Sequence, residues 1–101
     1  MWQVFDNGSS INQAGSEGTI IKDEEHSLGA RITLEENGVA APFSITCGVY
    51  GLMVHTVFIG EFNEAEKQFE AIKIDMQSFL NSDIEDGNTV TRWCEQFVAK
   101  Y

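Results

Sequence analysis

The stretch from residue 37 to residue 60 contains no Asp, Glu, Lys or Arg, although 22% of the whole chain is charged. A charge-free run of this length raises the question of a transmembrane helix. However, Pro42, Gly48 and Gly51 interrupt it, many of its apolar residues are β-branched or aromatic, and no cluster of bases flanks it. The composition therefore favours two buried strands, over 43–50 and 52–59, with a tight turn near Tyr50.

The hydrophobic period differs between the two ends of the chain. Short runs at 2–5, 19–25 and 30–36 have the composition of strands, and Asn37-Gly38 is a turn signal. From Phe62 onward the apolar residues recur every three or four positions, which predicts a helix over 62–82. A second stripe with this spacing ends at Tyr101 and predicts a second helix.

Polar residues at the expected helix starts suggest their caps. Asn63 with Glu66 three residues later resembles a capping box, and Asn88 or Thr89 could cap the second helix. Between the helices, 81–88 is rich in turn-forming residues.

Strands followed by helices predict an α+β fold. We expect an antiparallel sheet of four to five strands in the N-terminal two-thirds, covered on one face by two C-terminal helices. The 101 residues suit a single domain, and the polar, glycine-containing stretch 6–18 is expected to be a loop.

The densest run of charge is KDEEHSLGARITLEE, residues 22 to 36. If residues 26–29 form the loop of a hairpin, Glu25 faces Ala30 and Glu24 pairs with Arg31. Oppositely charged residues then lie across from each other on one face, and apolar residues share the other face. This amphipathic hairpin is the interpretation we favour over a metal or acid–base cluster, because neighbouring strand residues point in opposite directions. We expect no metal site and no cofactor.

His55 and Cys47 are candidate ligand-binding residues within the charge-free run. Together they could form a nucleophile–base dyad. With a two-residue turn, Thr46 faces His55 and the dyad fails; with a loop one residue longer, Cys47 lies opposite His55. The sequence leaves this register open. The simpler interpretation is that His55 is a core histidine and that Cys47 and Cys94 are buried thiols.

The net charge is −10, from 16 acids and 6 bases. This charge excludes nucleic acid and anionic membranes as natural partners, because binding to both depends on basic residues. It permits a basic protein partner. The N-terminus lacks the basic segment and apolar core of a signal peptide, so we expect a cytoplasmic protein.

These features favour a non-enzymatic protein-binding or inhibitor module, similar in behaviour to an immunity protein, that acts through its acidic surface. Glu24 and Glu35 are its candidate partner-binding acids, and Trp93 and Tyr101 are candidate anchors if they are exposed. A homodimeric accessory subunit is one alternative. The other is a small ligand-binding or enzymatic domain with a pocket between sheet and helices near His55. No catalytic residue is assigned.

Overall fold

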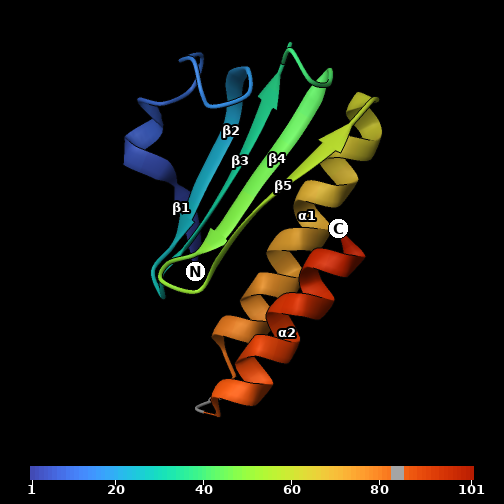
Figure 1. Ribbon diagram of the computed structural model, residues 1–101. Helices are drawn as coiled ribbons and strands as arrows, with labels where there is room; N and C mark the ends of the chain where they lie inside the picture. The colour runs from blue at the N-terminus through green and yellow to red at the C-terminus, as the bar shows by residue number, and fades with distance from the viewer. Residues whose placement is uncertain (83–85) are drawn as a thin grey trace.

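The computed structural model describes residues 1–82 and 86–101. Its five-stranded antiparallel sheet has the order β1-β2-β3-β4-β5, so each strand pairs with its neighbours in the sequence (Figure 1). The strands are β1 (Trp2–Val4), β2 (Thr19–His26), β3 (Ala30–Glu36), β4 (Phe43–Val49) and β5 (Met53–Ile59). A 3-10 turn, η1 (Phe5–Gly8), follows β1, and the helices are α1 (Phe62–Leu80) and α2 (Gly87–Lys100). The predicted α+β fold is confirmed.

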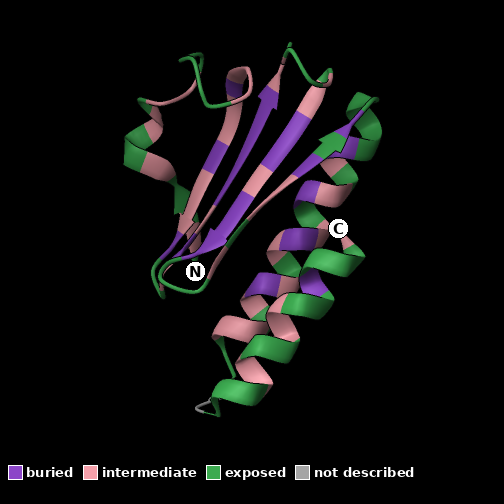
Figure 2. Ribbon diagram, in the orientation of Figure 1, coloured by how far each residue is buried: buried purple, intermediate pink, exposed green. Residues whose placement is uncertain are grey.

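Both helices lie on one side of the sheet (Figure 1). The apolar stripe of α1 packs on the central strands β3 and β4, where a continuous core is buried (Figure 2). The buried residues of α1 are Ala65, Phe69, Ile72 and Met76. Full burial of one large apolar side chain such as Phe69 stabilises the fold by roughly 1.5–3 kcal/mol. In the described part of the chain, no helix is both long and apolar enough to cross a membrane.

Helix α2 joins this core through aromatic side chains. Phe97 is buried, and its ring lies 5.0 Å from the rings of both Trp93 and Tyr101. Trp93 also stacks on Phe79 of α1 at 4.1 Å. These stacked rings tie α2 to α1.

The predicted helix caps are wrong. The side chain of Glu61 caps α1 by accepting hydrogen bonds from two backbone N–H groups. Asp86 caps α2 by accepting hydrogen bonds from the backbone N–H of Asn88 and from the hydroxyl of Thr89. Asn63 and Asn88 lie inside the first turns of α1 and α2 and donate their backbone N–H groups to these caps. The predicted break at 81–88 includes 83–85, which lie outside the described residues.

The β2–β3 hairpin has a different register from the predicted one. His26 pairs with Ala30 and Glu25 pairs with Arg31, so the loop has three residues instead of four. Its last residue, Gly29, has φ = +102°, a conformation that suits glycine and is common in three-residue hairpin loops. This one-residue difference moves the side chains of residues 22–26 to the other face of the sheet relative to β3. An irregularity between Ile20 and Lys22 returns Thr19 and Ile20 to the predicted register.

As a result, Lys22, Glu24 and His26 point toward α1. Lys22 pairs with Glu66 of α1 at 3.3 Å, and Glu24 pairs with Lys73 at 2.8 Å. Asp23 and Glu25 point to the side of the sheet that carries no helix. The helix-free side of the sheet therefore carries the carboxylates of Asp23 and Glu25.

Candidate functional site

The helix-free side of the sheet, here called the open face, is a grid of three cross-strand rows. The middle row is polar from β2 to β5, since Asp23, Thr33, Thr46 and Thr56 lie directly across from one another. The two flanking rows are Glu25–Arg31–Gly48–Val54 and Ile20–Glu35–Ser44–Phe58. Arg31 is the only base on this face, because the other five bases lie on α1, on α2 or on the helix side of β2.

Residues 5–18 fold back over the β2–β3 half of the open face. Asp6 and Asn7 have positive φ angles of 48° and 55°, which turn the chain tightly after β1. The ring of Phe5 then lies 3.6 Å beneath the guanidinium carbon of Arg31. Ser10 donates a hydrogen bond to Asp23 at 2.8 Å. The β4–β5 half is left open.

A cavity of about 630 Å³ occupies the middle of the open face. Gly15 and Ser16 form one wall, the loop at 50–52 forms the other, and Thr46 and Gly48 contribute to the floor. Gly48 keeps the floor low because it has no side chain. This volume lies within the range of pockets that hold ligands. We call this cavity the open-face groove.

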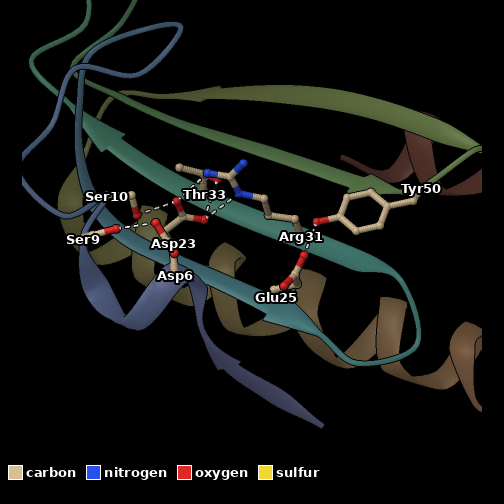
Figure 3. Close-up of polar contacts among 8 residues, drawn as sticks. All are labelled: Asp6, Ser9, Ser10, Asp23, Glu25, Arg31, Thr33 and Tyr50. Carbon is tan, nitrogen blue, oxygen red and sulfur yellow. Dashed lines mark hydrogen bonds and ion pairs between the residues drawn. The ribbon is translucent and has the colours of Figure 1, made fainter.

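Asp23 is a buried carboxylate whose charge is compensated within the fold (Figure 3). It is 2% exposed and receives two hydrogen bonds from Arg31, at 2.9 and 2.7 Å. Thr33 and Ser10 donate two more. The same contact raises the pKa of Arg31 above its ordinary value, chiefly through the hydrogen bonds to Asp23 and against the effect of partial burial.

Arg31 uses only one edge of its guanidinium group in this contact. Nε and Nη2 bind Asp23, and Nη1 donates to no group in the described residues. Figure 3 shows the third nitrogen turned away from Asp23. Since Arg31 lines the groove, this nitrogen can donate to a carbonyl oxygen of a bound molecule.

Glu35 is the second buried carboxylate of the open face, and it forms no ion pair within residues 1–82 and 86–101. It is 2% exposed, and its Oε1 accepts hydrogen bonds from the backbone N–H groups of Glu17 and Gly18, each at 3.1 Å. The loop comes so close here that a Cβ at Gly15 would lie 2.0 Å from Oε1. Glu35 therefore fixes the loop and lines the groove with a charged group.

The hairpin wall combines apolar side chains with one tyrosine. Leu52 and Val54 are exposed at the groove, and Phe58 is exposed farther along β5. The hydroxyl of Tyr50 donates to Glu25 at 2.6 Å. Partial burial, followed by this hydrogen bond, raises the pKa of Tyr50 to about 12. The wall thus offers apolar contact area next to negative charge.

Cys47 and His55 lie opposite each other, which is the longer-loop register. Their side chains point to the helix side, away from the open face, and the Cys47 thiol donates to the backbone oxygen of His55 at 3.6 Å. Burial raises the pKa of Cys47 to about 12, so the thiol stays protonated at neutral pH. This geometry does not activate Cys47 as a nucleophile.

His55 packs near Phe97, with 6.5 Å between the ring centroids. Its Nε2 is buried and has no hydrogen-bond partner among the described residues. His55 does not line the groove, whereas Cys47 borders it. The predicted pocket between sheet and helices is occupied by the apolar core, and the cavity lies on the opposite side of the sheet.

The other candidate residues are separated in the structure. Glu24 lies under α1 in its pair with Lys73, on the opposite side of the sheet from Glu35. Trp93 on α2 and Tyr101 directly after this helix are both half-buried, and the Tyr101 hydroxyl donates to Asp75. Of the predicted partner-binding residues, only Glu35 is part of the groove.

Sequence reasoning missed Arg31, Thr33 and Asp23 as a connected group. The signal that could have found them is Gly29, because glycine at the last position of a three-residue loop places Ala30 opposite His26. Within residues 1–82 and 86–101, no cluster of three or more His, Cys, Asp or Glu residues could hold a metal ion. Comparison with protein-family models, with curated proteins and with solved structures found no match.

Proposed function

We propose that this chain is a non-enzymatic protein-binding module that holds an extended, basic segment of a partner protein in the open-face groove. The groove itself carries this proposal, because it combines an apolar wall, an available Arg31 donor and uncompensated negative charge. These are the features of a site that recognises a polypeptide with basic side chains.

The charge distribution supports a basic partner. The sheet residues of the open face carry three carboxylates, at positions 23, 25 and 35, and the single guanidinium group of Arg31. Elsewhere, Lys22, Lys73 and Lys100 are paired with acids of the same chain. The net charge of −10 is therefore not hidden by a basic surface patch and can steer a cationic partner.

The same charge favours a foreign partner over a second copy of this chain. Two copies that each carry −10 repel each other at low ionic strength. A module that covers the basic surface of its partner would act as an inhibitor. Both cysteines are free thiols, which supports a reducing, cytoplasmic setting.

A blocked groove tests the proposal. Thr46→Trp places a large side chain on the floor of the cavity, and Ile74→Trp adds the same side chain at a site on α1 that is 68% exposed. The unmodified protein and the Ile74 variant should retain the same basic proteins from a lysate, identified by mass spectrometry. Thr46→Trp should lose them, and circular dichroism should show an unchanged fold.

Raising the salt concentration should release these proteins, because the Debye length falls to about 8 Å near 0.15 M. Equal retention by all three forms would mean that the groove is not the binding site. Retention of the chain itself as the main captured species would point to self-association and contradict the proposal.

A further inference from the structure

The two buried carboxylates of the open face differ in one respect that the fold leaves unexplained. Asp23 is saturated by four donated hydrogen bonds, two of them from a cation. Glu35 is equally buried, at 2% exposure. It receives only the two backbone N–H groups at Oε1, and Oε2 accepts no hydrogen bond from the described residues.

Burying a carboxylate without a positive partner opposes folding, since the charge loses its hydration. Two backbone donors offset part of this cost. A neutral glutamine at position 35 could accept the same two N–H groups, so these hydrogen bonds do not explain why residue 35 is a glutamate. A cation supplied from outside the chain would complete the site.

We infer that Glu35 is the specificity-determining residue of the open-face groove and that its Oε2 receives the ammonium or guanidinium group of a lysine or arginine side chain from the partner segment. This inference rests on the proposed function. It specifies that Glu35 recognises a basic side chain of the partner segment. The loop holds Glu35 before the partner arrives, so little reorganisation accompanies binding.

The surroundings of Glu35 favour a cationic side chain over a free metal ion. A metal ion needs three or more converging ligands, and the described residues place no such set in the groove. A long aliphatic side chain can instead lie along the floor near Thr46, with its charged end at Glu35. The rest of the segment reaches toward Leu52 and Val54.

The available Nη1 of Arg31 can donate a hydrogen bond to the same partner segment. Arg31 and Glu35 lie on the same face of β3, four residues apart, which corresponds to about 13 Å along an extended strand. A partner segment that places a lysine at Glu35 therefore extends far enough for a main-chain carbonyl oxygen to approach Arg31. A small free amine would reach only one of these two groups.

A double-mutant cycle between protein and peptide tests this inference. The probes are acetyl-Val-Thr-Lys-Thr-Val-amide and its analogue with norleucine in place of lysine, titrated into the full chain and followed by amide chemical shifts. The protein variant is Glu35→Gln, which keeps an oxygen that can accept the N–H groups of Glu17 and Gly18. Glu64→Gln, on the exposed side of α1, is the matched control.

The unmodified protein should bind the lysine peptide roughly tenfold more tightly than the norleucine peptide, as expected for one charge-assisted hydrogen bond. Glu35→Gln should remove this preference, and Glu64→Gln should retain it. Because the cycle compares two peptides on the same variant, a general loosening of the loop cancels.

An unchanged lysine preference in Glu35→Gln would overturn the inference. If Thr46→Trp still abolished peptide binding, the groove would remain the site and only the role of Glu35 would fall. Binding of both peptides that is insensitive to Thr46→Trp would contradict the proposed function as well. Butylammonium binding as tightly as the lysine peptide would show that the occupant is a small amine, not a polypeptide.

Discussion

At the scale of single residues, burial has different consequences for different chemical groups. Asp23 stays compatible with the interior because Arg31 and two hydroxyl groups satisfy it. Cys47 has no such partners and is kept neutral instead. Glu35 has hydrogen-bond donors but no cationic partner in the described residues, and this difference underlies the binding role that we propose for it.

Cys47 should react slowly with a thiol reagent in the folded protein. At neutral pH, Ellman's reagent should modify the half-buried Cys94 first and Cys47 only as the chain unfolds. A Cys94→Ala variant isolates the slow thiol. Rapid modification of the Cys94→Ala variant under native conditions would show that Cys47 is a reactive thiolate, and it would support Cys47 as a nucleophile.

The pH dependence of stability follows from the same thiol. Its pKa rises on folding from the ordinary 9.0 to about 12, so the neutral thiol is favoured in the folded state. This contribution is fully present below pH 9 and is lost as the pH rises toward 12. In urea titrations, the free energy of unfolding should fall across this window, and it should fall less in Cys47→Ala. Equal slopes for the two proteins would count against the assigned pKa.

At the scale of elements, loop length decides which side chains share a face. Both the β2–β3 and the β4–β5 hairpins have three-residue loops, at 27–29 and 50–52. The first loop places Asp23 on the same face of the sheet as Arg31, and the second places Cys47 opposite His55. Each loop contains one glycine with a positive φ angle, Gly29 at the third position of the first loop and Gly51 at the middle position of the second.

The start of α2 provides an element-scale prediction. Asp86→Ala removes the side chain that accepts the N–H of Asn88, so the free energy of unfolding should fall by about 1 kcal/mol. Asn88→Ala keeps this cap and should change stability by less than about 0.5 kcal/mol. Urea denaturation of the two variants measures the difference. A larger loss of unfolding free energy for Asn88→Ala than for Asp86→Ala would show that Asn88 is the cap, as the sequence suggested.

At the scale of the whole molecule, the sheet separates two chemistries. The helix side buries a continuous apolar core, with ion pairs where α1 passes over β2 and between the two helices. The other side is polar, partly covered by residues 5–18, and hollowed over Gly48. The excess of negative charge also destabilises the compact state through repulsion between the acids.

Salt should therefore stabilise the free protein. Raising the ionic strength from about 0.01 M to about 0.15 M shortens the Debye length from about 30 Å to about 8 Å and weakens repulsion between the acids. We expect the melting temperature to rise by roughly 2–5 °C, equivalent to less than about 1 kcal/mol for a chain of this size. Differential scanning calorimetry measures this shift.

The double variant Glu64→Gln/Glu95→Gln provides the control, because it removes two exposed negative charges without breaking an ion pair of the described residues. Its melting temperature should rise less with salt. A fall in melting temperature for the unmodified protein would show that its internal ion pairs outweigh the repulsion.

The sequence by itself determined the order and type of the elements. The charge-free run, the change of period at Phe62 and the apolar stripe through Phe69 and Met76 are local patterns, and local patterns are what secondary structure follows. They were sufficient for the α+β fold, for one covered face of the sheet, and for the strand β3 at its observed bounds.

Only the tertiary structure decided the site. Whether Asp23 meets Arg31 depends on a one-residue choice of register, and the hydrophobic pattern of β2 constrains that choice weakly because charged residues occupy both of its faces. The contact of Glu35 with the amides of Glu17 and Gly18 depends on how a loop folds back over the sheet. A loop of this kind follows from packing against distant residues, which no local pattern encodes.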